Sequence, residues 1–220
     1  MRKVLIVGMT MFSAELCEIL RREGVKVIGY SVDNAYRSSD SFYGLPIFSF
    51  EEIEKDLDMT SVEVALTLGY SQMNDNRELK YRQCKEKGVK LLTYVSKQSQ
   101  VYTEKIGEGS LILPGTYVGP YSEIGLGTII RPGTVLAHHD KIGNYNWIAD
   151  GCTLGGGVIM GSHCFLGLGT TIRNEVSIAD YTFIGAHSYV AKDTELSKAY
   201  IGIPAKKVCE KDAYKMVCKV

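Results

Sequence analysis

A strict six-residue repeat of apolar side chains runs through the second half of the chain. Neither a helix, with a period of 3.6, nor an alternating strand, with a period of 2, produces this spacing. A hexapeptide repeat is typical of a parallel β-helix, in which each short strand points one large side chain inward and the chain then turns a corner. The sixteen positions are Ile106, Ile112, Val118, Ile124, Ile130, Leu136, Ile142, Ile148, Leu154, Met160, Leu166, Ile172, Ile178, Ile184, Val190 and Leu196.

The fourth residue after most of these positions is small, as a slot beside a tight corner requires. Serine, threonine, cysteine or valine fills it from Ser110 to Thr194, with two exceptions on consecutive hexads, Asp140 and Asn146. Both exceptions lie close to the His138-His139 pair. A local rule that fails at one place often marks function or strain, so we expect the site there.

The first half of the chain alternates between strand and helix patterns. Short connections between such elements predict a small parallel sheet covered on its faces, so we expect a Rossmann-like α/β domain over residues 1–97 and a link to residue 104. The expected strands are 3–7, 25–30, 62–68 and 90–95, and the expected helices are 13–22, 50–57 and 74–87.

Ligands of such sheets bind at the carboxyl ends of the strands, which here means the loops at Gly8, Asp33 and Gly69. The dinucleotide fingerprint GxGxxG is absent, which argues against NAD-linked chemistry. Thr10 and Ser13 have two interpretations. They cap the following helix, or they hold a phosphate at its N-terminus.

The β-helix is expected over residues 104–203, with three hexads forming each triangular coil. Its flat outer faces suit packing against copies in a closed threefold ring, whose clefts would be natural ligand sites. A tail, 204–220, is expected to leave the prism near Tyr200. In this tail Lys206 and Lys207 either meet a phosphate at a subunit edge or are solvated surface charges.

Composition excludes several classes of function. Lys and Arg number 25, as do Asp and Glu, so the chain has no basic excess for nucleic acid or anionic membranes. No apolar run approaches the roughly 20 residues of a membrane span, and the N-terminus reads as a strand rather than a signal peptide. Six cysteines without a CxxC pair fit free thiols in a reducing compartment, so we expect a cytoplasmic protein.

His138 is the leading candidate for chemistry. It follows the inward Leu136 by two positions, so it projects outward, where a histidine can act as a general base near neutral pH or can simply pack across a subunit contact. Asp140 occupies an inward slot. It either orients a histidine by accepting its N–H or bonds corner amides beside Asn146.

A metal site is the rival interpretation. His139, His163 and His187 are evenly separated, each by one coil plus one hexad, and therefore fall on different sides of the prism. Within one subunit they cannot converge on a metal, and closely spaced ligand pairs are missing. We therefore expect no metal.

The two-part layout resembles the sugar O-/N-acyltransferases of the sialic acid O-acetyltransferase and bacillosamine N-acetyltransferase type. The resemblance covers nearly the whole chain and is strongest over the β-helix. His138 before Ile142-Gly143, the run 148–158 and the closing run 201–206 carry it. It implies a left-handed β-helix homotrimer that uses acetyl-CoA and acetylates an amino or hydroxyl group of a nucleotide-linked sugar.

Carried over by position, the resemblance makes His138 the general base and Gly156 the backbone amide that stabilises the acetyl oxygen. Leu168 and Ala186 match positions that line the pantetheine channel. Gly8, Asp33 and Gly69 match the acceptor-nucleotide loops.

The chain departs from the family in three places. His139 stands where the family has an acidic residue after the base, Trp147 replaces a histidine near the acyl group, and residues 9–12 replace a glycine-rich loop. The last two departures indicate an unusual acceptor sugar, or one without the expected nucleotide.

The sequence therefore predicts an acetyl-CoA-dependent sugar acetyltransferase that works by direct transfer, with His138, His139 and Asp140 at the reacting centre. Trp147, Gly156, Leu168, Ala186 and Lys206 are the expected cofactor contacts. A non-catalytic trimeric module that binds sugar nucleotides, and a zinc-dependent β-helix hydratase, are the alternatives.

Overall fold

The computed structural model describes residues 3–217, except the side chains of residues 209–211. The chain forms two compact units. The first unit comprises the residues up to Gly69 together with Leu79–Leu92, and the second comprises Tyr70–Glu78 and the residues from Thr93 onward. No helix among the described residues is long and apolar enough to cross a membrane.

The first unit is built on a six-stranded sheet with the order β3-β4-β2-β1-β5-β6, in which all neighbours except β3 and β4 are parallel. Strands β1 and β5 at its centre consist almost entirely of buried side chains, which explains their largely apolar sequence. The elements are β1 (Lys3–Val7), α1 (Met11–Arg22), β2 (Lys26–Val32), the 3-10 turn η1 (Asn34–Tyr36), β3 (Ser41–Phe42), β4 (Leu45–Ser49), α2 (Ile53–Asp56), β5 (Val62–Leu66), most of α3 (Asp75–Glu86) and β6 (Lys90–Leu91).

Three expectations for this unit need correction. The β3–β4 hairpin was not predicted, because its strands are short and only partly buried. The helix expected over residues 50–57 is a single turn, α2. The strand expected over residues 90–95 is two strands. Only β6 joins this sheet, whereas β7 (Tyr94–Val95) pairs with a strand of the second unit.

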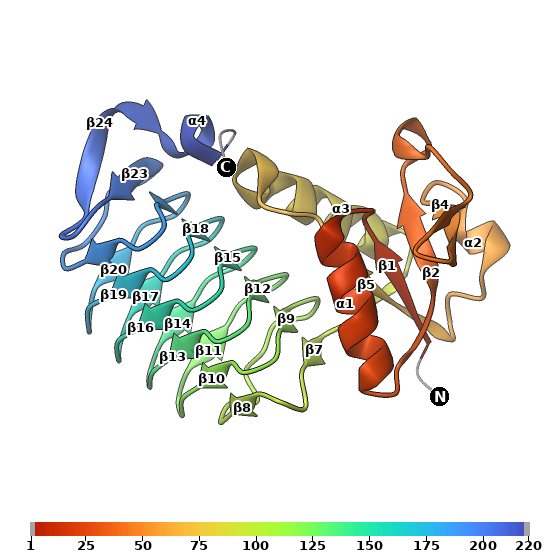
Figure 1. The fold of residues 1–220 in the computed structure, drawn as a ribbon, viewed down its shortest axis with the longest axis horizontal. Coiled ribbons are helices and arrows are strands. Elements are labelled where there is room, and N and C mark those ends of the chain that lie inside the picture. Colours follow the sequence, from red (N-terminus) through yellow and green to blue (C-terminus); the bar gives the residue numbers. More distant parts are fainter. Residues whose placement is uncertain (1–2, 218–220) are drawn as a thin grey trace. The chain divides into compact units, whose positions relative to one another are not determined.

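The second unit is a parallel β-helix whose coils stack with a register of three hexads on every face (Figure 1). The first face contains β8 (Gln100–Val101), β10 (Tyr117–Val118), β13 (Val135–Leu136), β16 (Thr153–Leu154), β19 (Thr171–Ile172) and β22 (Tyr189–Val190). The second face contains β11 (Glu123–Ile124), β14 (Lys141–Ile142), β17 (Ile159–Met160) and β20 (Ser177–Ile178). The third face contains β7, β9 (Leu111–Ile112), β12 (Ile129–Ile130), β15 (Trp147–Ile148), β18 (Phe165–Leu166), β21 (Phe183–Ile184), β23 (Lys198–Ile201) and β24 (Lys206–Asp212).

The hexapeptide positions from Ile112 to Val190 form the apolar core of this prism, and Ile106 is packed at its margin. The last position, Leu196, is 61% exposed, so the prediction that it belongs to the core was wrong. The chain also stays on the prism longer than expected. β23 continues the third face beside β21, and β24 returns antiparallel to it before α4 (Ala213–Val217).

The chain turns at three corners of the prism, one between each pair of faces. Each corner repeats a left-handed backbone position once per coil, occupied by glycine or by a residue such as Tyr121, His139, Tyr145 or His163. His139, His163 and His187 therefore lie at three different corners, as their spacing predicts.

Tyr70–Glu78, which contains the 3-10 turn η2 (Ser71–Asn74) and the start of α3, covers part of the third face. The Tyr70 ring makes edge contacts with Trp147 and Phe165, with centroids 5.1 and 4.8 Å away. The guanidinium of Arg77 is fully buried and donates to the carbonyl oxygens of Gly127, Tyr145 and Asn146 at 2.8–3.0 Å. The aromatic side chains that β15 and β18 point outward are thereby buried.

Candidate active site

The corner between the first and second faces carries His138 and Gly156 on adjacent coils. A Cβ atom built on Gly156 would lie 2.6 Å from Cε1 and 2.8 Å from Nε2 of His138, so the imidazole rests directly on the main chain of Gly156. The carbonyl oxygen of His138 accepts the N–H of Gly157 at 2.9 Å. Because His138 and Gly156 are three hexads apart, the fold itself brings this pair together.

His138 and His139 are bonded to each other at the surface. Their Nδ1 atoms are 3.0 Å apart and their rings are nearly perpendicular, at 89°. The ring of Tyr121, one coil earlier, packs on His139 with centroids 4.7 Å apart. Tyr121 was not predicted to lie at this site, although it precedes His139 by three hexads and the repeat itself could have identified it.

Asp140 lies apart from the histidine rings. Its side chain is fully buried inside the prism, and Oδ1 accepts the N–H of Val158 at 2.9 Å. The sequence allowed Asp140 either to orient a histidine or to bond a corner amide, and the hydrogen bond from Val158 is the second of these. Burial raises the pKa of Asp140 to about 7, against the lowering effect of hydrogen bonds from the main-chain amides around it.

Leu168 and Ala186 lie on adjacent coils at a different corner, between the third and first faces. Both are exposed, and Leu168 has 53% of its surface accessible. Lys206 is exposed at the start of β24. Within one chain, the first face separates these predicted cofactor contacts from His138.

Trp147 is placed elsewhere. Its ring lies on the third face beneath Tyr70, with only 7% of its surface exposed, and the Arg131 guanidinium lies 5.9 Å from it. The structure therefore does not bring Trp147 to His138, and a ring packed in this way has little surface left for a ligand. The tryptophan that distinguishes this position instead packs against Tyr70.

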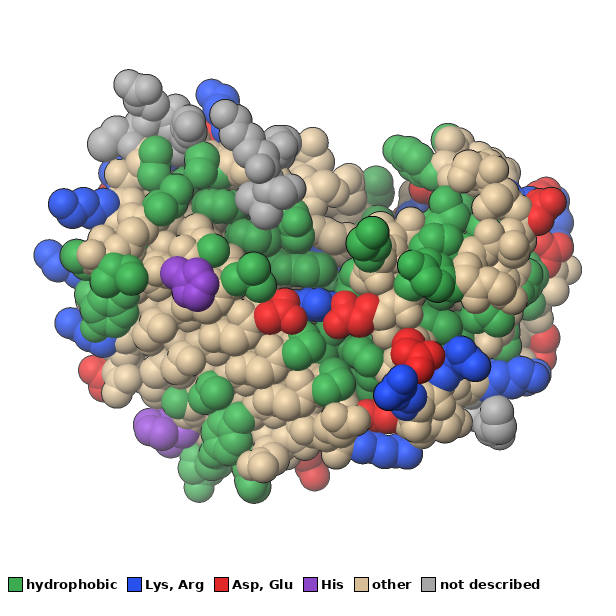
Figure 2. Space-filling view, in the orientation of Figure 1, with side chains coloured by type: hydrophobic (Ala, Val, Ile, Leu, Met, Phe, Trp, Pro, Cys, Tyr) green, Lys and Arg blue, Asp and Glu red, His purple; other side chains and the backbone are tan. Residues whose placement is uncertain are grey.

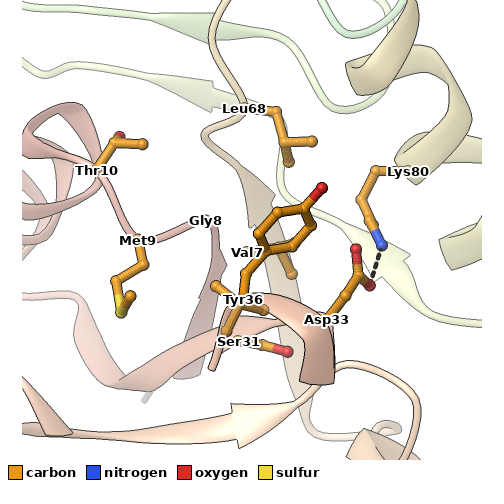
Figure 3. Close-up of a pocket in the computed structure, with 10 residues that line it drawn as sticks. Val7, Gly8, Met9, Thr10, Ser31, Asp33, Tyr36, Leu68 and Lys80 are labelled. Atoms are coloured by element: carbon orange, nitrogen blue, oxygen red, sulfur yellow. Dashed lines mark hydrogen bonds and ion pairs between the residues drawn. The ribbon is translucent and has the colours of Figure 1, made fainter. Parts of the chain in front are cut away.

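The first unit contains a pocket of about 370 Å³ at the carboxyl ends of β1, β2 and β5 (Figure 3). Gly8 and Asp33, two residues chosen from the strand ends, line it together with Thr10 from the first loop. At Gly8 the φ angle is +128°, and an added Cβ would approach Thr67 Oγ1 to 2.6 Å, so glycine is required there. Gly69 follows the same strand edge but does not line this pocket.

Lys80 lines this pocket and forms an ion pair with Asp33. Its ammonium lies 2.5 Å from Asp33 Oδ1 and 3.8 Å from the centroid of the Phe50 ring, and its side chain is only 7% exposed. The side chains of Tyr36, from η1, and Leu68, from the loop after β5, point toward the same space (Figure 3). Sequence reasoning missed Lys80, because its partner lies 47 residues away on another element.

Ser13 does not reach this pocket. It is fully buried and bonds Thr67 Oγ1 at 2.8 Å. Thr10 and Ser13 also form a reciprocal capping box, in which each side chain accepts the other's backbone N–H. The sequence allowed two roles for this pair, and the structure shows the helix cap. Of the two residues, Thr10 lines the pocket and Ser13 does not.

Histidine side chains are visible at the surface in Figure 2, and basic and acidic side chains are interspersed on the face shown. No single basic patch forms there, consistent with the balanced composition. The described residues also bring Asp75, Glu78 and His163 together. A carboxylate oxygen of each acidic residue lies 3.1 Å from a different ring nitrogen of the buried His163 imidazole.

No protein-family model matches the sequence, and a search of curated proteins finds no match. Solved structures do match along nearly the whole chain. The acetyltransferase domain of PglB from Neisseria gonorrhoeae FA1090, also solved with acetyl coenzyme A, has a TM-score of 0.84 at 20% identity, covering 94% of this chain and 100% of that domain. WeeI from Acinetobacter baumannii AYE has a TM-score of 0.83 at 22% identity, covering 94% and 100%.

A variant of GDP-perosamine N-acetyltransferase from Caulobacter crescentus, in complex with CoA and GDP-perosamine, matches with a TM-score of 0.74 at 22% identity. That match covers 94% of this chain and 96% of the other. The chain thus has the fold of these solved structures, an α/β domain followed by a left-handed parallel β-helix, in agreement with the fold that the sequence resemblance implied.

Proposed function

We propose that this protein transfers the acetyl group of acetyl-CoA to an amino or hydroxyl group of a nucleotide-linked sugar, with His138 as general base. The observation that carries this proposal is the His138 imidazole resting on Gly156 at the surface of the prism. In a fold shared with enzymes crystallised with acetyl coenzyme A or GDP-perosamine, this geometry offers a base and a main-chain amide on adjacent coils.

In this mechanism, the acceptor nitrogen or oxygen attacks the thioester carbonyl while His138 Nε2 takes its proton. The amide of Gly156 stabilises the developing oxyanion. The tetrahedral intermediate then collapses, and the C–S bond breaks as the proton held by His138 passes to the sulfur, so that CoA leaves as the thiol. Direct transfer is favoured over an acyl-cysteine, because Cys152 and Cys164 are buried and burial raises the pKa of each thiol to about 12.

We assign acceptor binding to the α/β domain, residues 1–97, and acyl transfer to the β-helix, residues 104–203. The pocket at Gly8 and Asp33 supports this assignment, since it lies at the strand ends where doubly wound sheets bind nucleotides. Lys80 supplies a buried positive charge, and the side chain of Asp33 is still 35% exposed. A nucleoside diphosphate offers both the phosphates and the hydroxyl donors that such a pair would bind.

A homotrimer completes the proposed site. The outward residues within the strands of the first face, from Tyr117 to Tyr189, carry no charge, although the exposed Arg173 follows β19, whereas the strands of the second face present Glu123 and Lys141. Packing the first face against a copy would bring one subunit's corner at Leu168 and Ala186 toward its neighbour's corner at His138. We place the reaction in the cytoplasm, where reduced cysteines and acetyl-CoA are both expected.

A thiol-release assay with acetyl-CoA and a panel of nucleotide-linked amino and deoxy sugars tests this function. We expect His138→Ala to lose turnover by roughly 10²-fold or more while still binding CoA, because it removes the base and not the binding groove. Full turnover by that variant would refute the role of His138. Stabilisation by nucleotide sugars but not by CoA, without thiol release, would favour a non-catalytic binding module.

A further inference from the structure

At the corner between the first and second faces, His138 and His139 share one hydrogen bond, so a single proton lies between their two Nδ1 atoms. Each neutral imidazole has one N–H and one bare nitrogen. The Nδ1 atoms of His138 and His139 are 3.0 Å apart, so one of them donates and the other accepts. If His138 donates, its Nε2 is bare and basic. If His139 donates, Nε2 of His138 carries the proton and cannot act as a base.

We propose that His139 is the positioning residue of this site, accepting the Nδ1–H of His138 and thereby keeping Nε2 of His138 free to act as the base. This inference rests on the proposed function for its catalytic meaning. The hydrogen bond and the tautomer are properties of the chain itself.

The surroundings of His139 support this role. The Tyr121 ring packs on one side of it, and its φ angle of +61° fixes its backbone in the left-handed region of a corner. Asp140, the acid next in sequence, cannot take the role because it points into the prism and bonds Val158. Among the described residues, no carboxylate forms an ion pair with either histidine.

A neutral acceptor has a consequence that a carboxylate would not have. When His138 takes the substrate proton, the positive charge of the imidazolium is stabilised by a hydrogen bond but by no adjacent negative charge. The titratable groups around the pair are Tyr121 on the preceding coil and the buried Asp140. On the next coil this corner is formed by Gly156 and Gly157, which have no ionisable side chain. One coil further, the same corner carries Glu175.

Three variants at position 139 separate orientation from charge and from packing. His139→Gly removes the acceptor without strain, since glycine occupies the equivalent corner position at Gly157 with φ +74°. His139→Asn keeps a neutral acceptor on Cγ, where Nδ1 was attached. His139→Asp puts a carboxylate there. Asparagine and aspartate both tolerate the left-handed conformation.

We expect His139→Gly to lower kcat by roughly tenfold or more, and His139→Asn to restore most of it, because an orienting hydrogen bond is worth part of the general-base contribution. In His139→Asp the acidic limb of the pH profile should move to higher pH by about one unit. A nearby carboxylate favours the protonated imidazolium, and the base works only when deprotonated. Profiles are repeated with Asp140→Asn, since Asp140 itself titrates near neutrality.

Full activity in His139→Gly would overturn the proposal, and so would a loss that His139→Asn does not restore. Nitrogen-15 NMR of labelled histidine gives a readout that needs no substrate. We expect His138 above neutral pH to show a protonated Nδ1 and a bare Nε2, and to lose that preference in His139→Gly. The opposite tautomer in the wild type would exclude the hydrogen bond, whether or not the acceptor sugar has been found.

Discussion

Asp140→Asn should stabilise the protein at neutral and alkaline pH, and the reason lies in the slot that Asp140 occupies. One hexad further on, Asn146 fills the equivalent slot. Its Oδ1 accepts the N–H of Cys164 at 2.7 Å, and its Nδ2 donates to the carbonyl oxygens of Gly143 and Gly161, both at 2.9 Å. The main chain around the slot therefore provides one N–H, which needs an acceptor on the side chain, and two carbonyl oxygens, which need a donor on the side chain.

Asp140 meets only the first of these requirements. Oδ1 accepts from Val158, whereas Oδ2 is buried without a hydrogen-bond partner. By the same register, the carbonyl oxygens of Ala137 and Gly155 correspond to the two that Asn146 bonds, so we expect them near this second oxygen. An ionised carboxylate cannot donate to them, but a protonated carboxyl group can. The raised pKa of about 7 has the same origin, because burial penalises the charged form.

The magnitude follows from proton linkage. The ordinary pKa of 3.8 applies to the unfolded chain, and the folded-state pKa of about 7 is higher by about 3. The folded state therefore binds more protons between these values, so this group's contribution to stability is greatest below about pH 4 and falls as pH rises toward 7. At about 1.36 kcal/mol for each pH unit, the full loss is on the order of 4 kcal/mol.

Urea denaturation of wild type and Asp140→Asn at several pH values between 5 and 8, at one protein concentration, measures this effect. The advantage of the variant in free energy of unfolding should grow as pH rises, because only the wild type has this carboxyl group to ionise. Asn146→Asp is the matched reverse variant, which should lose stability and acquire the same pH dependence. A stability difference that stays constant from pH 5 to pH 8 would refute the reasoning.

Three further variants test other parts of the structure. Lys80→Met should raise the KM for the nucleotide sugar roughly tenfold and leave that for acetyl-CoA unchanged, since it removes one charged contact; Lys87→Met, which also removes a lysine near Phe50, is the control. Arg77→Met should lower the free energy of unfolding by about 3 kcal/mol, measured in urea, because three carbonyl oxygens lose a charged donor. Gly156→Ala should lower kcat in the thiol-release assay by roughly tenfold or more, because the new Cβ displaces the ring of His138.

The β-helix could be predicted from the sequence because its contacts are periodic. Each strand pairs with the strands three hexads before and after it, so counting in sixes identifies the core, the corners and the adjacency of His138 with Gly156. The strand ends of the α/β domain are similarly local features, and they led to Gly8 and Asp33, which line a pocket in the structure. The exception is Leu196, the last position of the repeat, which follows β20, the last described strand of the second face, and is exposed.

The tertiary structure alone decided the features that interrupt this periodicity. Lys80 meets Asp33, and Tyr70 covers Trp147, through contacts between elements with no fixed spacing in the sequence. The direction in which Asp140 bonds depends on side-chain conformation within a slot whose position the repeat specifies but whose hydrogen bonds it does not. The six-residue period of the sequence thus determines which segments of the main chain become neighbours. Side-chain packing and rotamers determine which polar atoms form hydrogen bonds.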